Sequence, residues 1–205
     1  PGHLTIAVMG GTTMAHLASQ LTFQLSAGRE LSFVPARGGL GEAVTIQANS
    51  IAAAMAEATD SKYRALYVPE NLSSESYESL IKEPSVKEVL TLIDKAQVVI
   101  HSVGDALVMA KRRGMSPDTI RMLKAKHAVA EAFGVFYDAE GKVVYKIPQI
   151  GLQLADLDHI PYVFAVAAGK SKAKAIAAYM QHAPSRTWLL TDVGATNSIL
   201  TGATR

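Results

Sequence analysis

Short apolar runs alternate with helical patterns along almost the whole chain, and this alternation constrains the fold more than any other feature. The expected strands cover residues 4–9, 31–36, 65–68, 97–103, 162–168 and 187–191. Helical patterns separate these runs, and parallel strands need such crossover connections. Strands that are apolar at every position are buried on both faces. The order therefore predicts an α/β fold with a mostly parallel sheet covered by helices on both sides.

Several of the expected helices carry recognisable end signals. The helical patterns cover residues 14–25, 42–59, 77–82, 85–95, 105–113, 116 onward, 169–180 and 192 onward. Ser85 followed by Glu88 has the spacing of a capping box, and Gly114 is placed to end a helix. Pro117 suits the first turn of the next helix, and Asp192 is expected to cap the last one rather than to contact a ligand.

One segment breaks the alternation. The runs Val135–Tyr137 and Lys142–Ile147 flank Asp138-Ala139-Glu140-Gly141, which predicts a β-hairpin inserted into the α/β pattern. A chain of 205 residues forms one large domain or two small ones.

Composition excludes several classes of function. The chain has no cysteine, which excludes thiolate zinc sites and thiol redox chemistry. Its 20 basic and 18 acidic residues are dispersed, whereas nucleic-acid binding needs a wide basic stripe. No apolar stretch reaches the ~18 residues of a membrane span, and no signal peptide is visible. We expect a cytoplasmic protein whose present residues bind neither DNA nor membranes. A strand that starts so early in the chain suggests a fragment of a longer protein.

The turn after the first expected strand has the composition of an anion site. Gly10 and Gly11 are followed by Thr12, Thr13 and Met14 at the start of a helical pattern. Glycines let the backbone approach a ligand, and the first amides of a helix point outward as donors. Threonine hydroxyls add further donors. The turn predicts a phosphate cradle, although an ordinary strand-to-helix turn capped by a threonine explains the same letters.

Three further turns follow expected strands and should share one edge of the sheet with the first, because ligands bind beyond the carboxyl ends of parallel strands. They are Arg37-Gly38-Gly39-Leu40-Gly41, Val103-Gly104-Asp105 and Gly169-Lys170-Ser171-Lys172. The last lacks the first glycine of a nucleotide P-loop, since Phe164 stands there.

Arginine can hold a phosphate through two parallel donors. Arg37 therefore suits a phosphate, while the plainer alternative is a surface ion pair with Glu42. Lys170 and Lys172 likewise suit an anion or are simply solvated.

A single carboxylate stands out within an apolar stretch. Glu131 lies in Ala128-Val129-Ala130-Glu131-Ala132 and needs a partner if it is buried. It could accept hydrogen bonds from sugar hydroxyls, act as a general base, or form a buried pair with an arginine such as Arg112. The six histidines show no metal-binding spacing and are expected to be packing or surface residues.

Four segments in this order resemble the effector-binding domain of the SorC/DeoR-type bacterial transcriptional regulators. They are Val8–Thr13, Ala128–Gly141, Ala167–Ile176 and Leu189–Asp192. Within the family, Pro35–Glu42 resembles the branch that controls glycolytic genes. The resemblance covers essentially the whole chain. It implies a Rossmann-like three-layer sandwich, shared with glucosamine-phosphate deaminase and ribose-phosphate isomerase, across one effector-binding domain spanning residues 1–205.

The resemblance also implies a ligand and its contacts. The ligand would be fructose 1,6-bisphosphate or another phosphorylated sugar, with no cofactor. Gly11, Thr12, Thr13 and Met14 would hold one phosphate with the Gly169-Lys170-Ser171-Lys172 turn, and Arg37 with Gln47 the other. Glu131 would hold sugar hydroxyls, Gly104 and Asp105 would line the site, and Arg112 would lie at its rim or at a subunit contact.

The implied partners are those of a repressor. A homodimer is expected, and a tetramer for the full-length regulator. Operator DNA would bind only through an N-terminal helix-turn-helix domain that these residues lack. The competing function on the same fold is a sugar-phosphate isomerase or deaminase with Glu131 as base, and a third is an interaction domain without a small ligand.

Overall fold

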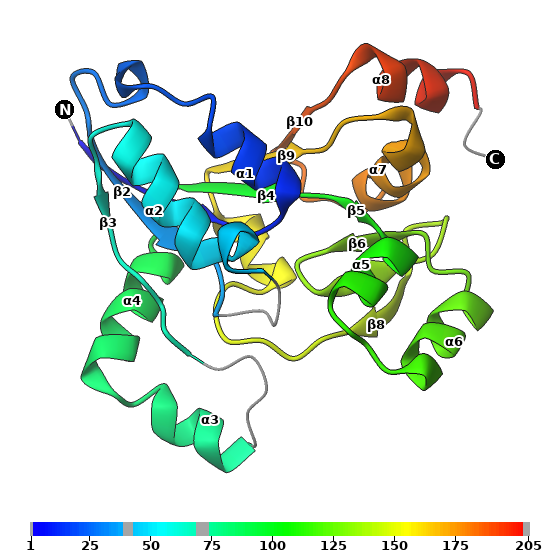
Figure 1. Cartoon of the computed structure of the whole chain (residues 1–205), viewed down its shortest axis with the longest axis horizontal. Coiled ribbons are helices and arrows are strands. Elements are labelled where there is room, and N and C mark those ends of the chain that lie inside the picture. Colours follow the sequence, from blue (N-terminus) through cyan, green and yellow to red (C-terminus); the bar gives the residue numbers. More distant parts are fainter. Residues whose placement is uncertain (1, 39–42, 69–73, 203–205) are drawn as a thin grey trace. The chain divides into compact units, whose positions relative to one another are not determined.

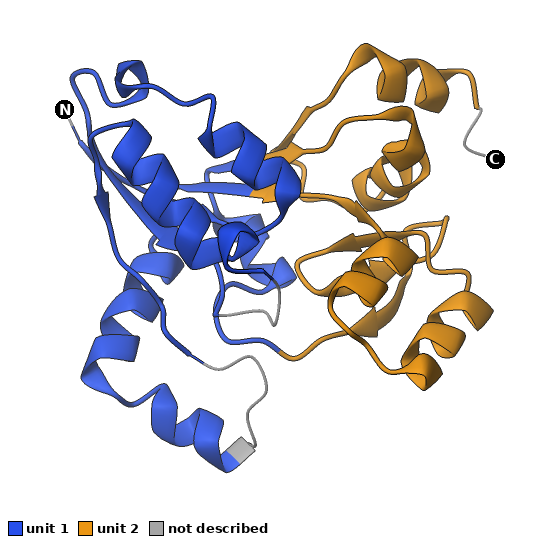
Figure 2. Cartoon of the chain, viewed as in Figure 1, with its two compact units in different colours: residues 1–100, 149–163 blue, residues 101–148, 164–205 orange. Residues whose placement is uncertain are grey.

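The structure is a computed structural model that describes residues 2–38, 43–68 and 74–202. The chain divides into two compact units, one of Pro1–Ile100 with Gln149–Val163 and the other of His101–Pro148 with Phe164–Arg205 (Figure 2). The main sheet has six strands in the order β10-β9-β4-β1-β2-β3, and a second sheet has four in the order β5-β6-β7-β8 (Figure 1). The predicted α/β class is confirmed.

The first unit is built on parallel strands. β1 (His3–Val8) pairs in parallel with β2 (Glu30–Pro35) and β4 (Val98–Ser102), and β2 pairs in parallel with the short β3 (Lys62–Tyr63). The helices are α1 (Thr12–Ala18), α2 (Ala48–Ala58), α3 (Ser74–Leu80) and α4 (Pro84–Asp94). Short 3-10 turns cover Phe23–Leu25, Val44–Ile46 and Leu154–His159.

The core of this unit lies on both faces of β1 and β2. Val8 and Phe33 pack with Ile51 and Met55 of α2 and with side chains of α1. The alternate residue Ala7 is fully buried as well, and α4 also contacts β1 and β2. Successive side chains of a strand point to opposite faces, so the predicted burial on both faces is confirmed here.

The second unit combines two kinds of strand. Its part of the main sheet includes β10 (Thr187–Leu190) and the end of β9 (Tyr162–Val166), with α7 (Ala173–Met180) and α8 (Val193–Leu200). The antiparallel sheet consists of β5 (Gly104–Asp105), β6 (Ala130–Ala132), β7 (Val135–Tyr137) and β8 (Val143–Lys146). The expected hairpin, β7–β8, is confirmed, but it is part of a larger sheet. Phe136 of β7 packs against α5 (Ala106–Arg112) and α6 (Pro117–Ala125).

Helix ends agree with the sequence where a cap is hydrogen-bonded. Asp105, Ser116 and Asp192 each accept a backbone amide at the start of their helix. The expected capping box at Ser85 is wrong, because α4 begins one residue earlier, at Pro84, without a side-chain cap. Proline already has the backbone angle of a first helical residue, so it starts the helix there.

Three element boundaries differ from expectation. The first helix ends at Ala18, and a separate turn covers residues 23–25. Within 42–59 the helix begins only at Ala48, because Gln47 is extended, and residue 42 lies outside the described part. Residues 65–68 form no strand. Instead Asn49 bonds the carbonyl of Leu66 at 3.0 Å and its amide at 2.9 Å, so a side chain replaces a strand partner.

Gly151 allows its own segment to lie directly against the segment that follows β2. Its φ is +120°, and a Cβ there would lie 2.4 Å from the Ala36 carbonyl oxygen and 2.6 Å from the Arg37 Cα. Gly151 and Arg37 form an antiparallel bridge, and the Leu152 amide donates to the Ala36 carbonyl at 2.7 Å. The segment after β2 is therefore fixed by the residues around Gly151.

We predict that Gly151→Ala lowers the free energy of unfolding by more than about 2 kcal/mol, because it adds a steric clash to an unfavourable backbone angle. Gly28→Ala is the matched control, since Gly28 has φ +72° but open space around its Cα. It should cost only about 1 kcal/mol. Urea denaturation measures both, and equal losses would show that the approach to Arg37 is not tight.

Candidate functional site

The turn between β1 and α1 has part of the expected anion-binding geometry. Gly11 is the residue before α1, with φ +122°, and no side chain caps the helix, so the alternative of a threonine cap is wrong. Thr12, Thr13 and Met14 are the first three residues of α1, whose amides lack acceptors within the helix. Thr12 is exposed and Met14 buried. The Gly11 amide itself donates to the Ile46 carbonyl at 2.8 Å, so it serves the fold.

Gln47 lies against this turn. A Cβ on Gly10 would be 2.5 Å from the Ile46 carbonyl oxygen and 3.4 Å from the Gln47 carbonyl carbon, so glycine allows the two segments to touch. Gln47 also lines a cavity of about 510 Å³ together with uncharged residues, among them Asn49, Tyr63 and Tyr67. The structure thus brings Gln47 to the turn of Gly11.

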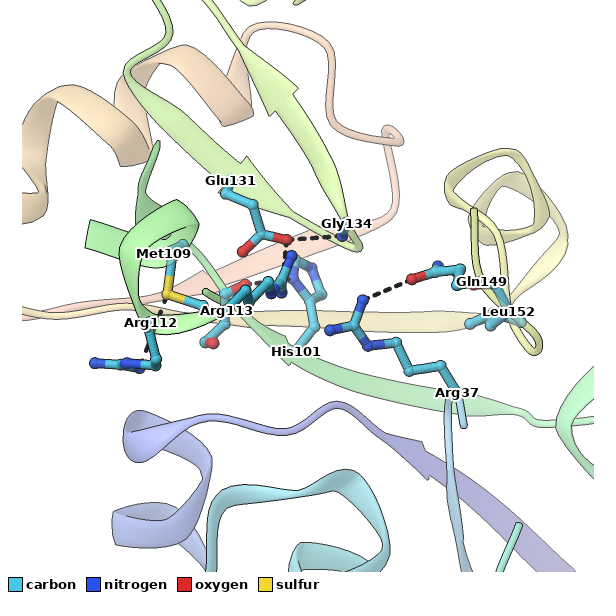
Figure 3. Close-up of polar contacts among 10 residues, drawn as sticks. Arg37, His101, Met109, Arg112, Arg113, Glu131, Gly134, Gln149 and Leu152 are labelled. Atoms are coloured by element: carbon cyan, nitrogen blue, oxygen red, sulfur yellow. Dashed lines mark hydrogen bonds and ion pairs between the residues drawn. The ribbon is translucent and has the colours of Figure 1, made fainter. Parts of the chain in front are cut away.

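Arg37 is buried rather than on the surface. Glu42, its expected ion-pair partner, lies outside the described residues, as do the glycines after Gly38. Only 1% of Arg37 is exposed, and its Nη1 donates to Gln149 Oε1 at 2.6 Å (Figure 3). Gln149 in turn donates to the Leu152 carbonyl at 3.0 Å. Arg37 follows β2 directly, while Gly10 and Gly11 follow β1, and these strands are neighbours. The two turns therefore leave the sheet at the same edge.

Glu131 is buried in the antiparallel sheet of the second unit and is paired with an arginine. Its Oε1 accepts the Gly134 amide at 2.7 Å and lies 3.1 Å from Arg113 Nη2 (Figure 3). The alternative of a buried ion pair is thus realised, but the partner is Arg113, the residue after the Arg112 that we expected. Arg112 is exposed, and its Nη1 lies 3.8 Å from Met109 Sδ.

Gly104 and Asp105 lie beside Glu131 because β5 pairs with β6. Gly104 is directly opposite Glu131, and a Cβ on Gly104 would be 2.6 Å from Met109 Cγ. Asp105 is committed to the fold, since its carboxylate accepts the Val108 amide at 2.9 Å and caps α5.

The turn of residues 169–172 is a 3-10 turn that precedes α7. Gly169 has φ +101°, and its amide donates to Asp192 Oδ2 at 2.9 Å, so this donor too is used internally. Asp192 also accepts the Ala195 amide at 2.7 Å and caps α8, as expected. Lys170 and Ser171 are exposed, and Lys172 is half-buried.

Two cations come close together in the second unit. Burial, and secondarily the positive charge of Arg112, lower the pKa of Lys172 below its usual value. Like charges that repel each other in this way are stabilised by an anion bound between or beside them. Within the described residues, no group of three or more acidic or histidine side chains is placed to hold a metal ion.

Comparison with known proteins identifies the family. The family described as "Putative sugar-binding domain" matches residues 1–201. A crystal structure of a "putative SorC family transcriptional regulator from Enterococcus faecalis" has 63% identity and a TM-score of 0.91, over 97% of this chain and 81% of that one. The chain belongs to the sugar-binding domain family of the SorC-type transcriptional regulators.

Curated relatives of this sugar-binding domain are regulators too. The central glycolytic genes regulator of Bacillus subtilis is 48% identical over 199 residues, which cover 97% of this chain and 58% of that protein. Its counterpart from Priestia megaterium is 49% identical over 196 residues, which cover 96% and 57%. The chain therefore spans somewhat more than half of their length. These relatives are regulators by name, and neither is named as an isomerase or deaminase.

More distant structures support the fold of the sugar-binding domain. The full-length sorbitol operon regulator SorC from Klebsiella pneumoniae superposes with a TM-score of 0.81 at 16% identity, over 96% of this chain.

Within the described residues, no helix is long and apolar enough to span a bilayer.

The sequence did not predict the residues that bind Arg37 and Glu131. Gln149, which binds Arg37, lies 112 positions away and carries no local signal. Arg113 is adjacent to the predicted Arg112. To decide which of the two faces Glu131, one must know exactly which side of α5 faces the sheet. Each miss concerns a partner brought in by the tertiary fold.

His101 is a buried packing residue in the second unit. Its ring is fully buried, lies 3.1 Å from the Tyr179 hydroxyl through Nε2, and packs against Phe133 with ring centres 4.7 Å apart. Burial lowers the pKa of His101 from 6.5 to about 4. The imidazole is therefore neutral in the folded protein at neutral pH, as expected of a packing residue.

We predict that the sugar-binding domain loses stability between pH 6.5 and pH 4. The unfolded chain binds a proton at His101 in this range while the folded chain does not, so the histidine costs up to about 3 kcal/mol by pH 4. Urea titrations at several pH values should show a flatter profile for His101→Gln than for the wild type. His182→Gln, at an exposed position, is the matched control for the substitution itself. An unchanged slope in His101→Gln would contradict this assignment.

Proposed function

We propose that residues 1–205 act as one effector-sensing domain of a cytoplasmic transcriptional repressor of glycolytic genes, and that the effector is fructose 1,6-bisphosphate or a related phosphorylated sugar. The observation that carries the proposal is the 48% identity to a central glycolytic genes regulator over 97% of the chain. The family's description as a sugar-binding domain supports a sugar as ligand. The phosphate part rests on the cations and helix starts described above.

In the first unit, two groups serve phosphates. The amides and hydroxyls at Thr12 and Thr13, with the neighbouring Gly11 and Met14, suit one phosphate because the start of a helix attracts anions. Arg37 and Gln47 suit the other. A guanidinium can hold a phosphate through charge-assisted hydrogen bonds, so a second phosphate-binding group favours a ligand with two phosphates.

In the second unit, Lys172 and Ser171, with Gly169 and Lys170, also serve a phosphate. Because Lys172 is half-buried and repelled by Arg112, a bound phosphate stabilises its charged form. Glu131 accepts hydrogen bonds from sugar hydroxyls, with Gly104 and Asp105 beside it and Arg112 at the rim.

Ligand binding regulates transcription through the assembly. We propose a homodimer, tetrameric in the full-length protein, with operator DNA bound by a separate N-terminal helix-turn-helix domain. The effector shifts the balance between two arrangements of the subunits, which requires that it bind one arrangement more tightly than the other.

Isothermal titration calorimetry of the domain with fructose 1,6-bisphosphate tests this function. A micromolar dissociation constant, about −8 kcal/mol, is expected from several charge-assisted hydrogen bonds after the costs of association. Fructose 6-phosphate should bind more weakly. No heat with either sugar phosphate, together with no change in melting temperature, would contradict the proposal.

Arg37→Ala should weaken fructose 1,6-bisphosphate by about 10- to 100-fold in the same titration and fructose 6-phosphate much less, because a charge-assisted pair contributes ~1.5–3 kcal/mol. Arg37→Lys keeps the charge but not the two parallel donors, and should fall between. Arg64→Ala removes an exposed arginine of the same unit and serves as control. Equal losses for both sugars in Arg37→Ala would remove Arg37 from the second phosphate.

A further inference from the structure

Among the described residues, the carboxylate of Glu131 has partners at one of its two oxygens. Oε1 accepts the Gly134 amide and faces Arg113 Nη2, at 2.7 and 3.1 Å. Oε2 receives no donor from the described residues, and Figure 3 shows it turned away from Gly134. A carboxylate oxygen has room for two hydrogen bonds, so Oε2 can serve a ligand.

Arg113 reaches Glu131 from a different element. Arg113 is the residue directly after α5, whereas Glu131 is the central residue of β6. The strand neighbours across from Glu131 are Gly104 and Phe136, which carry no charge. The ion pair therefore depends on how α5 packs over the sheet.

Both partners are withdrawn from solvent. The side chains of Arg113 and Glu131 are 6% and 5% exposed. A buried carboxylate without a cation is strongly unfavourable, and a second anion nearby makes it more so. The proposed ligand carries negative phosphates, which a negative Glu131 would repel. The charge of Glu131 must therefore be compensated if its carboxylate is to bind the sugar hydroxyls.

We propose that Arg113 is the positioning residue of the sugar-hydroxyl site. It fixes the rotation of the Glu131 carboxylate so that Oε1 is occupied and Oε2 faces the sugar, and it cancels the charge that would otherwise repel the ligand's phosphates. This inference rests on the proposed function of Glu131. It assigns the adjacent arginines different tasks, since Arg112 is exposed and acts on Lys172 instead.

A double-mutant cycle between Arg113 and Glu131 tests the assignment, with fructose 1,6-bisphosphate titrated calorimetrically into the domain. Arg113→Met should raise the dissociation constant by about tenfold or more, since it leaves a buried unpaired carboxylate. Glu131→Gln alone should also weaken binding, because Oε2 loses its charge. The double variant should bind more tightly than Arg113→Met, since the uncompensated charge is then gone. A residue that only packs would show no such rescue.

Arg112→Met is the matched control. It removes the neighbouring cation, and adding Glu131→Gln to it should give the sum of the two separate effects. If Arg113→Met fails to fold by circular dichroism, the cycle is repeated with Arg113→Lys, which keeps the charge and should show a smaller loss and a smaller rescue.

The outcomes separate the two proposals. If the wild type binds no sugar phosphate, the proposed function fails. If the wild type binds and the effects of Arg113 and Glu131 are simply additive, the sensor function stands and the positioning role of Arg113 is overturned. Unchanged affinity in Glu131→Gln overturns it as well, because Glu131 then holds no sugar hydroxyl.

Discussion

The parallel pairing of β1 with β2 is the constraint on which the candidate site of the first unit depends. Val8 stands opposite Pro35 at the end of the ladder, and the Ala36 amide donates to the Val8 carbonyl at 2.7 Å. The residues that follow must therefore leave the sheet side by side. This is why a glycine turn and a buried arginine, far apart in sequence, arise at one edge.

Arg37 and Glu131 bind partners that differ in charge. Arg37 donates to a neutral amide oxygen, that of Gln149, which orients the guanidinium without cancelling its charge. Glu131 is bonded to a charged arginine, which orients the carboxylate and cancels its charge. In the proposed function, Arg37 serves a phosphate, and Glu131, with its charge compensated, serves sugar hydroxyls.

The sequence predicted the elements better than their connections. Asp105, Ser116 and Asp192 were recognisable caps because the interaction that defines them spans only three residues. The hairpin at residues 135–146 was visible for the same reason. In contrast, the extended conformation of Gln47 and the replacement of a strand by Asn49 bonding to Leu66 depend on contacts between segments, which local patterns do not encode.

In the candidate site, too, local features were predictable from the sequence and contacts between segments were not. Burial of Glu131 follows from its apolar neighbours, but the identity of its arginine depends on the exact phase of α5. The amides of Gly11 and Gly169 looked available from the sequence, yet the fold bonds them to Ile46 and Asp192. Glycine-rich turns predict where a backbone can approach a ligand, whereas they do not predict which of its amides remain for that ligand.

We propose above all that this domain binds a phosphorylated sugar through Thr12, Arg37, Glu131 and Lys172. A crystal structure of the domain grown with fructose 1,6-bisphosphate tests it most directly. We expect phosphate oxygens within hydrogen-bond distance of the start of α1, of Arg37 and of Lys172, and a sugar hydroxyl within hydrogen-bond distance of Glu131 Oε2. A bound sugar phosphate that touches none of these four residues would contradict it.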